Sequence, residues 1–147
     1  MGQMTEVLLN GAMYRRFVNQ RLAPVYDTYD LNAVDVKVIL FLQSCGTDEN
    51  RMSDIVKQEA TNKGLISQSV AKLHERGLVD LQEDAADRRV RHLSLTNGAE
   101  QVAADLQSVY EEIHREVFEG VDAGELRSFL RVTEKIVDNL NEMAGIE

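Results

Sequence analysis

The feature that most constrains the fold is a change in the spacing of apolar residues at Gly77. Before it, Ile66, Val70 and Leu73 are four and three residues apart, which predicts a helix over residues 62–76 with one buried face. After it, residues 78–82 (LVDLQ) and 90–95 (VRHLSL) alternate apolar and polar side chains around the polar stretch EDAADRR. The pattern predicts a helix followed directly by a β-hairpin.

Two more helices are predicted ahead of this pair. Asn32 is a good N-cap with Asp35 at the capping-box distance, so a helix should begin there and run through the apolar stretch 36–45 until Gly46 ends it. Its richness in Val, Ile, Leu and Phe predicts a central, buried helix. A short helix over 52–59 then precedes the helix over 62–76, and together they form a helix-turn-helix pattern.

Long helices are predicted at both ends of the chain. The first runs from Met4 to about Asp27, with Pro24 expected to kink or end it near Leu22 or Ala23. The last two begin at residue 96 or 97 and at residue 125, and reach about residues 119 and 143. The predicted class is therefore mainly α with a small β-hairpin, in a single domain over residues 1–147.

The charge is unevenly distributed along the chain. The net charge is −9, but residues 51–95 hold 8 basic and 7 acidic side chains, whereas residues 96–147 hold 4 and 12. Exposed charges are screened over about 8 Å at physiological salt, so distant carboxylates would weaken a basic face only slightly. The overall acidity therefore does not exclude a nucleic-acid partner.

The order helix, helix-turn-helix and hairpin is that of a winged helix, whose second helix can enter the major groove of DNA. The face of 62–76 opposite the apolar stripe is predicted to point outward and to contact double-stranded DNA. Its side chains are suited to bases and phosphates, and Gly64 lets the backbone approach a phosphate. The residues predicted to do so are Asn62, Lys63, Gly64, Ser67, Gln68, Ser69 and Lys72.

The hairpin tip carries its own basic cluster. Exposed ion pairs contribute only about 0–1 kcal/mol, so stability alone gives little reason to place Arg88, Arg89 and Arg91 in this short stretch. We expect Asp87 to hold Arg88 or Arg89 outward, so that one of them enters the minor groove. A solvated turn with a local ion pair is the simpler alternative.

Three segments in this order resemble the MarR family of transcriptional regulators. They are LNAVDVKVILFL (31–42), NKGLISQSVAKLHERGLV (62–79) and DRRVRHLSLTNGAE (87–100). The resemblance implies a homodimeric winged helix-turn-helix repressor that binds a pseudo-palindromic operator. It implies dimerisation helices at about 4–29 and 97–144 and a DNA-binding lobe at about 32–95, with the recognition helix at 62–76 and the wing at 78–95.

The resemblance also implies a small-molecule effector bound in a cleft between the two lobes. The residues proposed to line it are Tyr14, Phe17, Tyr26 and Cys45. A redox role for Cys45 is less favoured, because nothing near it in the sequence except the distant Lys37 would lower the pKa of its thiol. A metal site at the isolated histidines is also less favoured, because no close set of metal ligands is present in the sequence.

Other classes of function are weighed against this one. We find no glycine-rich phosphate loop, serine elbow or paired catalytic residues, so neither an enzyme nor a cofactor is expected. The single cysteine, the lack of a signal peptide and the lack of a membrane-spanning run predict a cytoplasmic protein. The main alternative is a winged-helix module that binds proteins rather than DNA.

Overall fold

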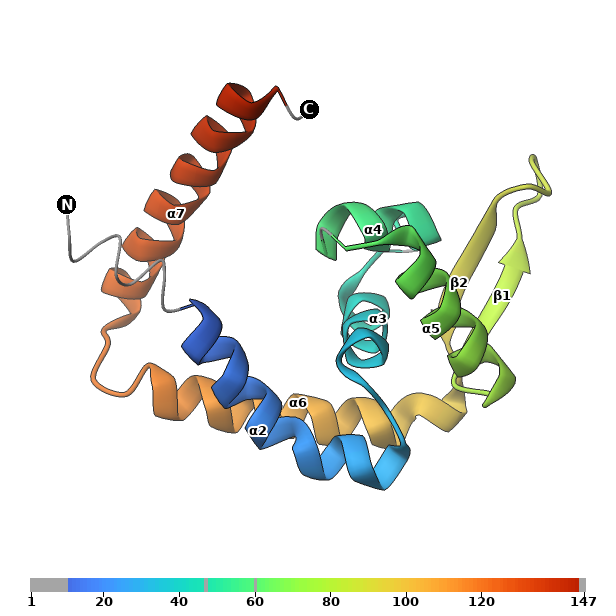
Figure 1. The fold of residues 1–147 in the computed structure, drawn as a ribbon, viewed down its shortest axis with the longest axis horizontal. Helices are drawn as coiled ribbons and strands as arrows, with labels where there is room; N and C mark the ends of the chain where they lie inside the picture. The colour runs from blue at the N-terminus through green and yellow to red at the C-terminus, as the bar shows by residue number, and fades with distance from the viewer. Residues whose placement is uncertain (1–10, 47, 60, 146–147) are drawn as a thin grey trace. The chain divides into compact units, whose positions relative to one another are not determined.

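The computed structural model describes residues 11–46, 48–59 and 61–145 (Figure 1). The helices and strands are α2 (Gly11–Tyr29), α3 (Ala33–Ser44), α4 (Met52–Glu59), α5 (Lys63–Glu75), β1 (Val79–Glu83), β2 (Arg91–Leu95), a 3₁₀ turn (Asn97–Ala99), α6 (Glu100–Val117) and α7 (Ala123–Ala144). They fall into two compact units, Met1–Ile113 and His114–Glu147. The mainly helical class with a small hairpin is confirmed. Residues 4–10 of the first predicted helix lie outside the described residues.

Helix α3 is the centre of the first unit, as its composition predicts. Val36, Val38, Ile39, Phe41 and Leu42 are all buried on it. They belong to one apolar cluster to which α2, α4, α5, the hairpin and α6 also contribute. The predicted capping box is present, because Asn32 Oδ1 accepts the amide of Asp35 at 3.0 Å and Asp35 Oδ2 accepts the amide of Asn32 at 2.9 Å.

The helix-turn-helix and the hairpin follow the predicted order. Asn62 caps α5, and Gly77 has a φ of 72°, which a glycine adopts without strain. Strands β1 and β2 pair antiparallel from Val79 opposite Leu95 to Glu83 opposite Arg91, within one residue of the predicted limits. Figure 1 shows this hairpin extending beyond α5.

Pro24 was expected to kink or end the first helix near Leu22 or Ala23, and the structure contradicts the ending. Helix α2 continues through it to Tyr29, although proline supplies no backbone N–H for the helical ladder. Leu22 and Val25, on either side of the proline, are both buried in the core. Their burial keeps the chain helical, and Thr28 Oγ donates to the carbonyl of Pro24 at 2.7 Å.

Helix α6 lies beside α2 in the first unit (Figure 1). The hydroxyl of Tyr29 donates to Asp105 Oδ2 at 2.6 Å, which joins the end of α2 to the first half of α6. The segment predicted to start α6 at residue 96 or 97 begins with the 3₁₀ turn, and the α-helix proper starts at Glu100.

Helix α7 makes up most of the second unit. Its N-terminus is a capping box between Asp122 and Glu125. None of its described residues is buried within the chain, although its apolar side chains recur at helical spacing. Across the described residues of both units, no helix combines the length and the apolar character needed to cross a bilayer.

Two neighbouring residues of α5 test how the core supports this helix. Ile66 is fully buried and Leu65 is 49% exposed. Ile66→Ala should lower the free energy of unfolding by about 2–5 kcal/mol, because it removes core contacts and leaves a cavity. Leu65→Ala should change it by about 0.5 kcal/mol or less. Urea denaturation followed by circular dichroism measures both, and equal losses would contradict the packing described.

Candidate nucleic-acid interface

The first turns of α5 present a polar face. Lys63, Gly64, Ser67 and Gln68 are exposed, as the sequence predicts. Asn62 is exposed too, but its Oδ1 accepts the amide of Gly64 at 2.7 Å and is therefore engaged as the helix cap. A Cβ on Gly64 would lie 3.0 Å from this oxygen, so the glycine keeps the cap compact.

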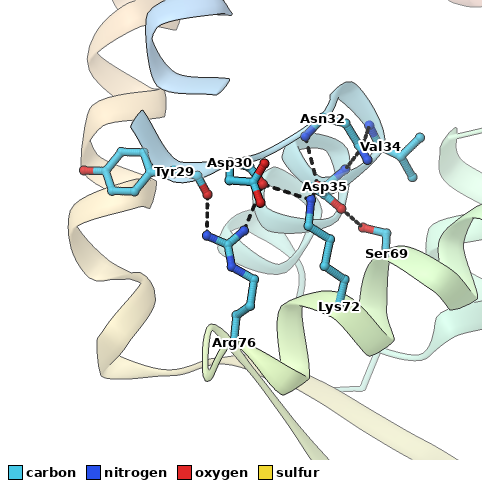
Figure 2. Close-up of polar contacts among 8 residues, drawn as sticks. All are labelled: Tyr29, Asp30, Asn32, Val34, Asp35, Ser69, Lys72 and Arg76. Atoms are coloured by element: carbon cyan, nitrogen blue, oxygen red, sulfur yellow. Dashed lines mark hydrogen bonds and ion pairs between the residues drawn. The ribbon is translucent and has the colours of Figure 1, made fainter. Parts of the chain in front are cut away.

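Ser69 and Lys72 were predicted to lie on this face, but their polar groups are bound to Asp35. Ser69 is buried, and its hydroxyl donates to Asp35 Oδ1 at 2.7 Å. Lys72 Nζ donates to Asp35 Oδ2 at 2.9 Å, as Figure 2 shows. The predicted outward orientation is wrong for Ser69. The Lys72 side chain stays 34% exposed, but its ammonium group is bound to Asp35, because the fully buried carboxylate of Asp35 requires polar partners from the helix packed against it.

A groove of about 510 Å³ lies between the start of α4, the start of α5 and the returning strand of the hairpin. Five cationic side chains line it: Arg51, Lys57, Lys63, Arg89 and Arg91. The rest of the lining is Met52, Ser53, Val56 and Val90, so among the described residues no carboxylate lines the groove. A concentrated positive charge of this kind attracts a polyanion.

Arg51 and Lys57 were not among the predicted DNA-contacting residues. Lys57 lies on α4, the first helix of the helix-turn-helix, and Arg51 is the residue before α4. Both lie far in sequence from Arg89. Only the packing of α4 beside the hairpin brings them to the same groove. The available signal was the concentration of basic residues in 51–95.

The hairpin tip is shaped by two aspartates. Asp84 Oδ1 accepts the amides of Ala86 at 2.8 Å and Asp87 at 3.0 Å. Asp87 Oδ1 accepts the backbone amide of Arg89 at 3.0 Å, whereas the predicted contact was with an arginine guanidinium. Asp87 thus orders the backbone beneath the arginines, and the side chains of Arg88 and Arg89 are exposed.

His92 joins the hairpin to the loop before α4. Its Nε2 faces Asp84 Oδ2 at 2.9 Å and its Nδ1 faces Asn50 Oδ1 at 2.5 Å. Asn50 Nδ2 also donates to the carbonyl of Leu93, and the amide of Leu93 donates to the carbonyl of Asn50. These contacts hold the two sides of the cationic groove together. The hydrogen bond from His92 and those from the amides of Ala86 and Asp87 lower the pKa of Asp84 to about 2.

The four residues proposed for an effector site lie on α2 and at the end of α3. Tyr14 is exposed, whereas Phe17, Tyr26 and Cys45 are partly buried against the core. Burial raises the pKa of the Cys45 thiol, which disfavours the reactive thiolate.

Tyr110 of α6 joins this region. Burial first, and then the neighbouring Tyr26, Tyr14 and Glu59, raise the pKa of Tyr110 to about 12. Tyr110 was not among the predicted residues, because its place on the partly buried face of α6 carries no mark in the sequence. In the part of the chain that the structure describes, no group of three or more His, Cys, Asp or Glu side chains could hold a metal ion.

Comparison with known proteins gives a consistent result for this architecture. Residues 31–99 match the family model of the winged helix DNA-binding domain. The fold is similar to that of the transcriptional regulator PA3341, with a TM-score of 0.80 at 22% identity over 94% of this chain and 97% of that one.

Two further solved structures share the fold. A MarR-family transcriptional regulator from Silicibacter pomeroyi has a TM-score of 0.75 at 20% identity, over 92% of this chain and 88% of that one. The MepR–DNA complex of S. aureus has a TM-score of 0.73 at 16% identity, over 87% and 93%. The likeness is one of fold, and it confirms the predicted winged helix.

The contacts of Asp84 predict an unusual titration at the hairpin tip. Its pKa is lowered in the folded protein from 3.8 to about 2. Its stabilising contribution is therefore complete above pH 3.8 and is lost as the pH falls towards 2. Carboxyl-detected NMR should give a midpoint near 2 for Asp84, and the amide shifts of Ala86 and Asp87 should follow it. A midpoint near the ordinary value would contradict these contacts.

Proposed function

We infer that this chain, which matches the winged helix DNA-binding domain over residues 31–99 and has a fold similar to that of a MarR-family transcriptional regulator, is itself a sequence-specific DNA-binding transcription regulator. The observation that carries the inference is the cationic groove beside the exposed start of α5, whose described lining holds no carboxylate. In a chain of net charge −9, five cations converge where the first turn of a recognition helix meets the wing.

The chemistry of this surface suits duplex DNA. Lys63, Ser67 and Gln68 are exposed on the first turns of α5, where they can meet base edges in the major groove. The free amide groups and dipole at the start of a helix favour a phosphate beside Gly64. Arg51 and Lys57 add phosphate-binding charge from α4.

The wing supplies the second contact region. Arg88 and Arg89 are exposed at a tip whose backbone is already ordered by Asp84 and Asp87. Ordering in advance reduces the entropy lost on binding. We propose that one of these two arginines enters the minor groove, while Arg91 on β2 faces phosphate.

The acting species is proposed to be a homodimer. Helix α7 has an apolar face with no buried residue in the chain, and such a face is covered by a partner in solution. Its exposed apolar side chains are Phe129, Leu130, Val132, Val137, Leu140 and Met143. A second copy covers this face by two-fold symmetry and places two recognition helices about 34–36 Å apart on a pseudo-palindromic site.

Repression and response to an effector complete the proposal. A dimer on an operator that overlaps a promoter blocks transcription. The partly buried Tyr26, Phe17 and Tyr110 offer aromatic surface and hydroxyl groups near Tyr14. These groups suit a small aromatic effector, because pockets for such ligands combine apolar walls with a few polar groups.

Selection from a random duplex library tests DNA recognition. The protein should enrich a two-fold symmetric sequence, and log K against log salt should have a slope of about −5 to −9 for six to ten phosphate contacts. Lys63→Ala should weaken binding to all duplexes, whereas Gln68→Ala should relax preference at one base position. No enrichment and no binding at 50 mM salt would favour the protein-interaction module instead.

Sedimentation tests the dimer separately. Leu130→Glu places a charge on the apolar face of α7, where Leu130 is 52% exposed in the single chain. It should convert the dimer to monomer and weaken DNA binding strongly, because each half-site alone is bound loosely. Lys135→Glu, exposed on the polar side of the same helix, is the matched control and should leave the dimer intact. A monomeric wild type would refute this assembly.

A further inference from the structure

We propose that Asp35, Ser69, Lys72 and Arg76 form a clamp that fixes the position of α5 and thereby sets its DNA specificity without touching DNA. The proposal rests on the function inferred above and adds positioning residues to it. Figure 2 shows the four side chains between α5, the end of α2 and the start of α3. We call these four residues the α5 clamp.

The first half of the clamp is a buried carboxylate. Asp35 is fully buried, and its two oxygens accept Ser69 Oγ at 2.7 Å, Lys72 Nζ at 2.9 Å and the amide of Asn32 at 2.9 Å. The capping of α3 requires only one of these oxygens. The other contacts therefore serve the joint between α3 and α5, and the burial of a charge makes the joint intolerant of displacement.

The second half of the clamp supplies hydrogen-bond donors to the backbone carbonyls at the end of α2. The last carbonyls of a helix lack partners within it, and cations are favoured there. Arg76 Nη1 and Lys72 Nζ each donate to the carbonyl of Asp30 at 2.9 Å, and Arg76 Nη2 donates to that of Tyr29. Asp30 has a φ of 50°, which turns the chain sharply between α2 and α3 and presents its carbonyl to α5.

These hydrogen bonds fix the orientation of α5, which apolar packing alone does not. Ile66, Val70 and Leu73 bury the inner face of α5, but dispersion contacts permit small rotations and shifts of a helix. Hydrogen bonds require defined angles and distances. Because Ser69, Lys72 and Arg76 recur along one side of α5, their bonds define both the rotation of the helix and its position along its axis.

The clamp lies away from the groove that carries the proposed DNA contacts. Lys63, which lines the groove, precedes Ser69 by six residues, and neither Lys72 nor Arg76 lines the groove. Lys72 is instead bound to Asp35 and to the carbonyl of Asp30, and Arg76 is bound to the carbonyls of Tyr29 and Asp30. The clamp therefore acts on DNA only through the placement of Ser67, Gln68 and Lys63.

Two clamp variants test the proposal in full-length protein. Arg76→Met removes the contacts of Arg76 to the carbonyls of Tyr29 and Asp30, while Lys72 and Asp35 keep their partners. The double variant Asp35→Asn with Lys72→Met removes the buried ion pair without leaving an unpaired charge. Fluorescence anisotropy measures binding to the duplex that the wild type enriches and to an unrelated duplex of equal length. Circular dichroism establishes the folded fraction of each variant at the assay temperature.

Each variant should lose about tenfold or more in affinity for the enriched duplex, the scale of a lost base contact. Binding to the unrelated duplex and the salt slope should stay unchanged, since no phosphate contact is lost. Arg76→Lys, which keeps a cation near the carbonyls, should recover part of the preference. Glu75→Gln, an exposed neighbour on α5, is the matched control and should bind as the wild type does.

Two results would overturn the clamp while leaving the proposed function intact. If binding to both duplexes falls together and the salt slope weakens by about 2 per dimer, the cations are phosphate contacts. If the folded fraction falls but the affinity per folded molecule does not, the network serves stability alone. If the wild type itself shows no preferred duplex, the proposed function fails, and the clamp fails with it.

Discussion

The arrangement of the first unit depends on the buried carboxylate of Asp35. A buried charge is stable only when it is paired and hydrogen-bonded, and this one is satisfied by the start of α3 and by two side chains of α5. It therefore joins the initiation of one helix to the placement of another. Through Lys72, which also reaches the carbonyl of Asp30, the same group is connected to the end of α2.

The cationic groove depends on this placement. Lys63 reaches it from the first turn of α5, while Arg89 and Arg91 come from the hairpin and Arg51 precedes α4. His92, between Asp84 and Asn50, holds the hairpin against the loop before α4. A surface of positive charge thus forms in an acidic protein because packing gathers cations of three segments, while 12 of the 25 acidic residues lie in residues 96–147.

Local signals predicted the elements well and individual orientations less well. The caps at Asn32 and Asn62, the turn at Gly77 and the alternating strands depend on neighbours in sequence, so their elements were predicted within a residue or two. Pro24 does not end the helix, which was one of its two expected effects, because core packing on both of its sides outweighs the missing hydrogen bond. Arg51 and Lys57 were missed because the sequence does not show that the start of α4 packs beside the arginines of the hairpin.

The sequence by itself determined the order and type of the helices and strands, the helix caps and the basic character of residues 51–95. These properties arise from short-range hydrogen bonding and from the spacing of apolar side chains. Only the tertiary structure decided that Ser69 Oγ and Lys72 Nζ bind Asp35, thirty-four and thirty-seven residues away. Helical spacing assigns a polar residue to a face, but a buried charge on another helix decides whether that face stays exposed.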